Sequence, residues 1–455
     1  AVIEAACRSP APSVSQVVDW FGQQPWLDDS MARQRALATA LAANHPVPGR
    51  NRCLYLDVSA TAQHDLHTGI ERVARALVMA LIEHPPVGWR VEPVALTRVD
   101  GSWQYRCVRG FVLGLLGVPA AGWFDELTDM RPGDCLVTLD LYHDGVIRAA
   151  RNGVYDGLRR RGIHRWAVVH DLLPIRMPGC FPEGTDRNHR RWLEVVSGFD
   201  GLLCISGTVA ADVRAWQQEQ ASDPAGRPPC QVEWFHLGAD LTASAPSRGL
   251  DDTARSALAR MRERPTVLMV GTIEPRKGHL QVLDAFERLW QAGIDINLVV
   301  VGRPGWQGLP AGRRRNIPET LRRLRSSPEL DRRLIWLDNL SDEGLVAVMQ
   351  AGSCLITASY GEGFGLPVIE AARHGLTILV RDLPVFREVA GESALYFPDE
   401  RSPEAIVAAV REWLLRREQG MLPVMTARNW PTWRESADQF WQRLGRHLIG
   451  PGSRE

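Results

Sequence analysis

A glycine-rich loop framed by two glutamates is the segment of this sequence best suited to chemistry. The loop lies in Ser359–Ala371, follows an apolar run, has glycines at alternate positions, and leads into a pattern typical of a helix start. Glycine lets backbone N–H groups approach an anion closely, and a helix that begins there adds free N–H groups and the positive end of its dipole. The carboxylates of Glu362 and Glu370 can accept hydrogen bonds from the hydroxyls of a sugar or a ribose. The spacing therefore predicts a site for a phosphate and the sugar that it carries.

Two adjacent cations form the second candidate site, in Gly271–Gly278, between an apolar run and a predicted helix. Lys277 is the single lysine among the 53 cationic residues of the chain, and Arg276 precedes it. A compact ammonium on a flexible stem suits a point contact to phosphate. Adjacent cations in a loop are commonly solvated surface charge, so it is the unique lysine that favours a phosphate site. The sequence has no Asp-x-Asp motif for a metal. We therefore expect the cations and the helix N-terminus to replace Mg²⁺, and we expect no metal and no other cofactor.

The first half of the chain has weaker candidates. His170 and Asp171 come just after the apolar run Trp166–Val169, and Gly69 lies in Thr68–Arg72, a turn that opens a helix. Ligands of open parallel sheets bind beyond the carboxyl ends of the strands, which is where these residues are expected. The alternative interpretations are a structural histidine and a structural glycine turn.

Composition and charge exclude several classes of protein. The 53 Lys and Arg residues balance 53 Asp and Glu residues, so a nucleic-acid partner is not expected. The eight cysteines are scattered without metal-ligand spacing and indicate reduced thiols of a cytoplasmic protein. The start of the sequence lacks the layout of a secretory signal, and the longest apolar run, 111–124, is too short to span a bilayer. The arginine-rich stretch 313–325 is either a solvated helix face or a contact to anionic lipid or a lipid-pyrophosphate acceptor, which would place the protein on the inner face of the membrane.

Along the chain, short apolar runs alternate with amphipathic helical patterns in two series. One series occupies about residues 53–216 and the other about residues 266–380, with a polar, proline-rich interval between them. Such alternation predicts mainly parallel sheets covered on both faces. We expect an N-terminal helical extension in 1–48, a first doubly wound domain in 49–245, and a second in 246–429, hinged near residue 245.

The glycine-rich loop also carries a resemblance to a known family. The spacing E-x7-E within E-G-F-G-L-P-x-x-E-A, residues 362–371, closely resembles the retaining glycosyltransferases of family 4, which have the GT-B fold. The resemblance continues through 302–306 and 381–389 and covers roughly residues 50–448. Within that family, these motifs are most similar to those of the mannosyl- and rhamnosyltransferases of bacterial O-antigen and capsule assembly. It implies an α/β protein with two Rossmann-like domains facing across a cleft, an acceptor domain first and a donor domain second. Residues 430–448 are then expected to form a helix that packs back onto the first domain.

The resemblance assigns roles to the candidate residues. Arg276 and Lys277 are expected to neutralise the donor pyrophosphate and stabilise the departing nucleotide. Glu362 is expected to support the sugar, Glu370 to bind the ribose, and the loop at 337–340 to hold the nucleobase. As catalytic residues the resemblance implies His170, Asp171, Arg276, Lys277 and Glu362. As donor-binding residues it implies Gly69, Gly271, Arg276, Lys277, Leu340, Gly363, Phe364, Gly365 and Glu370.

The implied reaction is transfer of a hexose or 6-deoxyhexose, of mannose or rhamnose type, with retention of configuration. The donor is a GDP-, UDP- or dTDP-linked sugar, and the acceptor is a lipid-linked or growing surface glycan. The family generally lacks a well-placed nucleophile, so the implied mechanism is a same-face displacement in which the donor phosphate accepts the acceptor's proton. Two alternatives stay open: another enzyme of this architecture, such as a nucleotide-sugar epimerase or a sugar-phosphate phosphorylase, and a non-catalytic nucleotide-sugar-binding subunit that scaffolds a synthesis complex.

Overall fold

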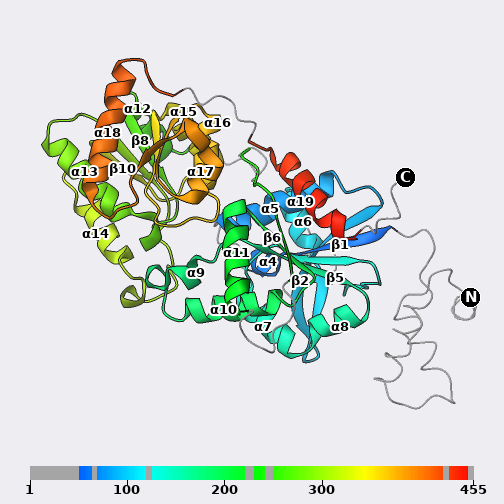
Figure 1. Cartoon of the computed structure of the whole chain (residues 1–455). Coiled ribbons are helices and arrows are strands. Elements are labelled where there is room, and N and C mark those ends of the chain that lie inside the picture. Colours follow the sequence, from blue (N-terminus) through cyan, green and yellow to red (C-terminus); the bar gives the residue numbers. More distant parts are fainter. Residues whose placement is uncertain are drawn as a thin grey trace, which may run out of the picture.

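Two lobes, each built around one sheet, make up the part of the protein that the structure describes (Figure 1). The computed structural model describes residues 51–63, 69–118, 125–220, 230–240, 249–423 and 430–448. The predicted helical extension in 1–48 lies outside the described residues, as does the predicted hinge near residue 245.

A seven-stranded sheet in the order β3-β2-β1-β4-β5-β6-β7 forms the first lobe. Neighbouring strands are parallel except β2 and β3, which pair antiparallel at one edge. β4 and β6 are buried along their whole length, which explains their short, continuous apolar sequences. The strands are β1 Arg52–Asp57, β2 Trp89–Val99, β3 Ser102–Cys107, β4 Cys135–Thr138, β5 His164–Val169, β6 Gly201–Cys204 and β7 Gln231–Trp234.

Helices cover this sheet and connect its strands. Their apolar faces supply the buried residues of the lobe; α5, for example, buries Val73, Leu77 and Leu81. The helices are α4 Ser59–Gln63, α5 Gly69–Glu83, α6 Arg109–Leu115, α7 His143–Arg151, α8 Val154–Arg160, α9 Leu173–Arg176, the 3₁₀ turn η1 Pro178–Cys180, α10 Thr185–Val196 and α11 Gly207–Gln220.

A six-stranded parallel sheet in the order β10-β9-β8-β11-β12-β13 forms the second lobe. Its strands are β8 Thr266–Val270, β9 Asn297–Val301, β10 Leu334–Leu337, β11 Cys354–Thr357, β12 Thr377–Arg381 and β13 Leu395–Phe397. Its helices are α12 Asp252–Met261, η3 Pro275–Lys277, α13 His279–Gln291, η4 Ala311–Arg313, α14 Ile317–Ser326, α15 Asp342–Ala351, α16 Leu366–Arg373, α17 Pro384–Ala390, η5 Gly391–Ser393 and α18 Pro403–Glu418. Two mainly parallel, doubly wound sheets are the architecture that the sequence predicted.

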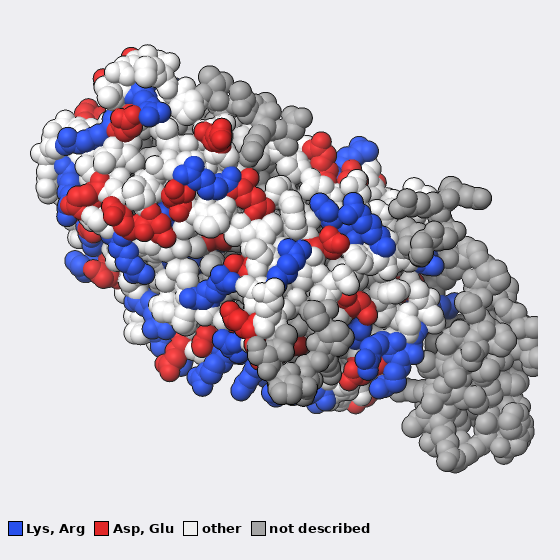
Figure 2. Space-filling model, in the orientation of Figure 1, with Lys and Arg blue, Asp and Glu red and all other residues white. Residues whose placement is uncertain are grey.

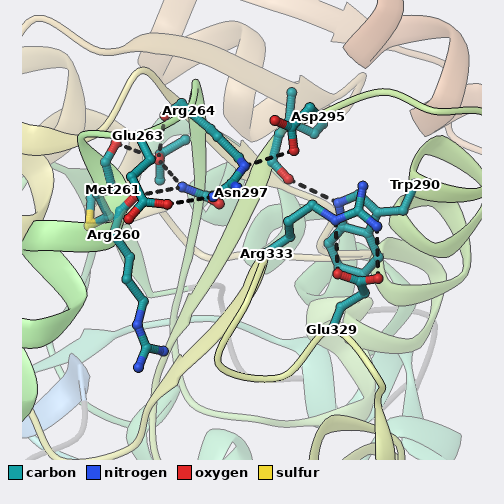
Figure 3. A network of polar contacts seen from close by, with 11 residues as sticks. Arg260, Met261, Glu263, Arg264, Trp290, Asp295, Asn297, Glu329 and Arg333 are labelled. Atoms are coloured by element: carbon teal, nitrogen blue, oxygen red, sulfur yellow. Dashed lines mark hydrogen bonds and ion pairs between the residues drawn. The ribbon is translucent and has the colours of Figure 1, made fainter.

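A polar network lies near the amino ends of the strands in the second lobe (Figure 3). Arg264, just before β8, contacts Asp295 at 2.7 Å, and Arg333, just before β10, contacts Glu329 at 2.7 Å. Asn297, the first residue of β9, donates to a backbone carbonyl of α12 at 3.2 Å. The glycine-rich loop and the cation pair follow the carboxyl ends of β11 and β8 instead. The network therefore ties the sheet together at the ends of the strands that are remote from the candidate site.

Glu388 of α17 joins the two lobes. Its carboxylate accepts hydrogen bonds from the backbone N–H groups of Gly207 and Thr208 at 2.7 and 2.8 Å, at the start of α11. The Thr208 hydroxyl and His236 Nε2 also contact it, at 2.6 and 2.9 Å. Burial raises the pKa of Glu388, but these hydrogen bonds outweigh burial and lower it to about 2. An ionised carboxylate thus caps a helix of the opposite lobe, where the helix dipole favours negative charge.

The last described helix, α19 Trp433–Leu448, returns to the first lobe and lies against α5, β6 and β7 (Figure 1). Phe440 is fully buried there and meets Phe235 edge to face, with ring centroids 5.5 Å apart. The Trp433 backbone N–H donates to Asp240 at 2.7 Å, which anchors the start of the helix. The apolar face of α19 therefore completes the core of the first lobe.

Replacing Phe440 with alanine is expected to lower the free energy of unfolding by about 3–5 kcal/mol, because it removes a fully buried ring and leaves a cavity between α19 and the sheet. Urea denaturation measures this loss. Gln442→Ala, on the exposed face of the same helix, is the control and should change stability by less than about 0.5 kcal/mol. Equal stability of the two variants would show that α19 does not support the first lobe.

The distribution of surface charge and the length of the helices are the two features relevant to membrane contact. On the face shown in Figure 2, positive and negative side chains are interspersed. Among the described residues, no helix combines the length and the apolar character needed to cross a bilayer.

Candidate active site

The glycine-rich loop and the cation loop meet beyond the carboxyl ends of β11 and β8. Lys277 Nζ lies 2.5 Å from Glu362 Oε1, and Arg276 lies 3.0 Å from Glu362 Oε2. Arg276 also contacts Glu274 at 3.0 Å, and the Ser359 hydroxyl donates to Glu362 at 2.6 Å. The side chains of Lys277 and Glu362 are only 14% and 9% exposed. The structure thus brings three predicted catalytic residues into one largely buried ion cluster.

The cluster holds Glu362 in its ionised form. Burial raises the pKa of Glu362, but Lys277 and Arg276 outweigh burial and lower it to about 2. Burial lowers the pKa of Lys277, and Glu362 opposes that effect. Burial lowers the pKa of Arg276, but the carboxylates of Glu362 and Glu274 outweigh burial and raise it. Both cations are therefore neutralised in part by one loop carboxylate.

The backbone of the two loops keeps this geometry. The Tyr360 N–H donates to the Arg276 carbonyl at 2.8 Å, so the loops are hydrogen-bonded directly next to the cluster. Gly278 has φ +77°, and a Cβ at this position would lie 2.4 Å from the Ala358 carbonyl oxygen. Only glycine therefore allows the cation loop to approach the carboxylate loop so closely.

Arg381 is a buried support of the site that sequence reasoning did not identify. It is fully buried at the end of β12, and its guanidinium donates to the carbonyls of Ala358 and Ser359 at 3.1 Å each. It also bonds to Gln281 of α13, the helix that follows Lys277, and lies over the Tyr360 ring at 4.4 Å. Arg381 thereby links the start of the glycine-rich loop to the helix that follows the cation loop. An arginine that ends an otherwise apolar strand is the sequence signal that could have found it.

His170 and Asp171 of the first lobe lie against the glycine-rich loop. A Cβ at Gly363 would lie 2.0 Å from the His170 carbonyl oxygen, and the Ser206 hydroxyl donates to the Gly363 carbonyl at 2.8 Å. The Asp171 side chain accepts a hydrogen bond from a backbone N–H of α9 at 2.9 Å. Burial raises the pKa of Asp171, and this effect exceeds the opposing effect of the nearby Arg276. The carboxyl ends of β5, β6 and β11 therefore converge from the two lobes.

The His170 ring is turned into the first lobe, and its exposed fraction is 3%. Its Nε2 donates to the Leu139 carbonyl at 2.8 Å, and burial lowers its pKa, so the ring is neutral near pH 7. Nδ1 makes no hydrogen bond to any described residue. A contact between this nitrogen and a donor sugar stays a prediction.

Glu370 is paired with Arg72 across the lobes. Arg72 lies in the first turn of α5 and forms an ion pair with the Glu370 carboxylate, which is 2% exposed. Burial lowers the pKa of Arg72 to about 10, and the charge of Asp342 at the start of α15 opposes this. The start of α15, two residues after Leu340, is therefore near Arg72. The sequence analysis placed Arg72 in the turn that opens α5 but gave it no role in the site.

The other predicted donor-binding residues lie around this cluster. Gly69 begins α5, and Gly365 precedes α16 with φ +92°. A Cβ at Gly271 would meet the Lys277 stem at 3.6 Å. Phe364 is buried with its ring centroid 5.6 Å from that of His236, so its ring packs between the lobes.

This arrangement suits an anion that carries a sugar. Two cations and the start of α16 can hold a pyrophosphate, while Glu362 and Glu370 can accept hydrogen bonds from hydroxyls. Within the described residues, no group of His, Cys, Asp and Glu has the arrangement of a metal site.

Comparison with known proteins agrees with this geometry. Residues 251–429 match the glycosyl transferases group 1 family. The chain is 39% identical over 420 residues to a serotype-specific mannosyltransferase, WbdA, of Escherichia coli, covering 92% of this chain and 48% of that protein. A D-inositol 3-phosphate glycosyltransferase of Mycolicibacterium paratuberculosis is 30% identical over 197 residues, which is 40% of this chain and 42% of that protein. The chain thus spans about half the length of the mannosyltransferases that it matches.

Solved structures of similar shape extend the comparison to both lobes. A trehalose-phosphate synthase of Burkholderia xenovorans superposes with a TM-score of 0.57 at 15% identity, over 88% of this chain and all of the other (100%). A sucrose-phosphate synthase of Thermosynechococcus elongatus superposes with a TM-score of 0.56 at 17% identity, over 87% and 99%. At these identities the likeness shows the fold alone. The chain therefore has the GT-B fold, and its residues 251–429 are similar to the glycosyl transferases group 1 family.

Proposed function

We propose that the chain is a retaining, metal-independent mannosyltransferase that extends a bacterial surface polysaccharide such as an O-antigen. The observation that carries the proposal is the ion cluster of Arg276, Lys277 and Glu362, which lies where the two lobes converge. The 39% identity to a serotype-specific mannosyltransferase over 92% of this chain supports mannose over rhamnose as the transferred sugar. The donor is then a nucleoside diphosphate mannose, with GDP-mannose as the first candidate.

The chemistry follows from charge development during transfer. Breaking the bond between the sugar and the donor phosphate leaves positive charge on the sugar and negative charge on the departing nucleoside diphosphate. Arg276 and Lys277 bind that negative charge, and Glu362 faces the positive charge on the sugar. The acceptor hydroxyl forms the new glycosidic bond on the face that the phosphate leaves, and its proton passes to the departing phosphate oxygen. Contact between the lobes excludes water and limits hydrolysis of the donor.

The acceptor is a lipid-linked or growing glycan. We propose that the protein acts on it in the cytoplasm, at the inner face of the membrane. We propose that the arginine-rich stretch 313–325 contacts anionic lipid there. Binding of the protein to vesicles that contain anionic lipid tests this contact, and a solvated helix face would show no such binding.

Nucleotide binding tests the donor site. In calorimetric titrations with EDTA present, one of GDP, UDP and dTDP is expected to bind with a Kd in the range of about 1 to 100 μM, and Lys277→Ala is expected to weaken that binding at least about tenfold. EDTA removes divalent metal, so binding under this condition checks metal independence together with the base preference. Absence of binding to all three nucleotides would reject the donor site.

Product analysis separates the proposed enzyme from its alternatives. A transferase releases nucleotide and forms a new glycoside only when an acceptor is present. An epimerase converts the donor sugar without an acceptor. A scaffolding subunit binds the nucleotide sugar and leaves it unchanged with every mannose-terminated acceptor.

A further inference from the structure

An open cavity of about 460 Å³ lies in the first lobe, outside the ion cluster, between the start of α7 and the start of α10. All the side chains that line it are polar: His143, Glu183, Thr185, Arg187, Asn188 and Arg191. α7 follows β4, and α10 follows the loop beyond β5, so the cavity opens at the carboxyl edge of the sheet. This edge is where open α/β sheets bind ligands.

Short contacts connect this cavity with the candidate donor site. His143 on its wall bonds to His189 at 2.9 Å, and His189 bonds to the Asp171 carbonyl at 3.0 Å. Asp171 is the neighbour of His170, whose carbonyl packs against Gly363, and its charge is felt by the Arg276–Glu362 pair. Arg315 of the second lobe also donates to the carbonyl of Phe181, two residues before the cavity wall begins, at 2.6 Å. The cavity wall is therefore linked to the donor site by a chain of direct contacts, and its edge is in contact with the second lobe.

The two histidines fix the hydrogen-bonding state of the cavity wall. A carbonyl oxygen only accepts, so His189 Nε2 carries the hydrogen in its bond to Asp171. Burial lowers the pKa of His189 to about 4, so the ring is neutral near pH 7 and its Nδ1 accepts. His143 Nε2 must then donate to it. Burial likewise lowers the pKa of His143 to about 3, which leaves His143 Nδ1 as an acceptor without a hydrogen bond to any described residue.

The charges on the wall favour an uncharged, hydroxyl-rich ligand. Glu183, Arg187 and Arg191 form no ion pair with any described residue, so their hydrogen-bonding groups are available. A carboxylate, two guanidinium groups and an amide together offer the acceptors and donors that neighbouring hydroxyls of a sugar ring require. A phosphate would meet the Glu183 carboxylate as a like charge.

We propose that this cavity binds the terminal sugar of the acceptor glycan, and that His143 Nδ1 accepts a hydrogen bond from one of its hydroxyls. The inference rests on the proposed function for the identity of the reaction. It adds the site and the class of the acceptor, a neutral saccharide end. His189 acts through His143 and is a positioning residue.

Binding and kinetics with the methyl glycoside of α-linked mannobiose test the inference on the full chain. Saturation-transfer NMR with GDP present measures binding of the glycoside without turnover, and steady-state assays with GDP-mannose measure KM. His143→Phe is expected to weaken glycoside binding and raise its KM at least about tenfold, because a hydroxyl partner is lost. The KM for GDP-mannose is expected to stay within about twofold, since the donor loops are untouched.

Three further variants make the result specific. His143→Asn places an oxygen acceptor near the position of Nδ1 and should keep the glycoside KM within about threefold of the wild type. Asn188→Ala removes a wall group that is not part of the histidine pair and should raise the KM in the same direction as His143→Phe. Arg148→Ala, exposed on α7 away from the wall, is the control and should change nothing.

Each outcome decides the inference. Equal glycoside affinity in the wild type and His143→Phe would overturn it, as would a wild type that does not bind the glycoside but shows Arg187-dependent binding of inorganic phosphate. If the wild type binds the glycoside, loses it in His143→Phe, and transfers no sugar, the cavity assignment holds and the proposed function fails.

Discussion

Replacing Lys277 with alanine is expected to lower kcat for mannosyl transfer by about 100- to 1,000-fold, the size of effect seen when a preorganised charge-stabilising group is lost. Lys277 lies 2.5 Å from Glu362 in a largely buried cluster, so its ammonium is held in place before the donor arrives. Negative charge grows on the donor phosphate as the sugar departs, which makes the interaction strongest in the transition state. Initial rates of nucleotide release with saturating donor and acceptor measure the effect.

Two companion variants separate catalysis from stability. Lys277→Arg keeps the charge but not the compact shape, and its kcat is expected to fall between those of the wild type and Lys277→Ala. Arg333→Ala removes a cation from the network at the amino ends of the strands (Figure 3), where it contacts Glu329 and the Trp290 ring. It should lower Tm and leave kcat unchanged. A Lys277→Ala enzyme with wild-type kcat would remove Lys277 from the mechanism.

Replacing Glu362 with glutamine is expected to lower the free energy of unfolding by about 3–5 kcal/mol, because it leaves the buried cations Arg276 and Lys277 without their shared carboxylate. Saturating GDP is expected to recover more stability in this variant than in the wild type, since the pyrophosphate supplies the missing negative charge. Urea denaturation with and without GDP measures both quantities. The kcat is expected to fall as well, because Glu362 faces the sugar.

The pH dependence of this contribution follows from the direction of the shift. The pKa of Glu362 is lowered from 4.5 to about 2, so the folded state binds its proton less tightly than the unfolded state. Its stabilising contribution is present above pH 4.5 and is lost as the pH falls through about 2. The difference in stability between wild type and Glu362→Gln should therefore shrink across that interval.

Glu388→Gln is the matched control for this experiment. Glu388 also has a pKa lowered to about 2, but its partners are backbone N–H groups, a hydroxyl and His236 at the contact between the lobes. Its loss should reduce stability without enlarging the increment from GDP. If GDP stabilises Glu362→Gln no more than it stabilises the wild type, Glu362 and the pyrophosphate do not share the same cations.

The sequence by itself determined the features that depend on neighbouring residues. Continuous apolar runs indicated parallel strands buried on both faces, because such strands need apolar side chains on each side. The glycine-rich loop before α16 and the cation pair after β8 were likewise predicted, because loop, strand end and helix start are adjacent in the chain. The edge pair of β2 and β3 was not predicted, since it depends on which strands become neighbours.

Only the tertiary structure decided which of these groups meet and in which direction they point. The ion pair of Arg72 with Glu370, the hydrogen bond of Ser206 to Gly363 and the capping of α11 by Glu388 join residues far apart in the chain. His170 was predicted at a strand end, but the direction of its ring depends on the Leu139 carbonyl, which follows the neighbouring strand β4. No local spacing encodes such contacts, because they arise when elements far apart in the chain pack together, within one lobe or between the two. For the same reason, the cavity at His143 became visible only once β4 and β5 had brought α7 and α10 together.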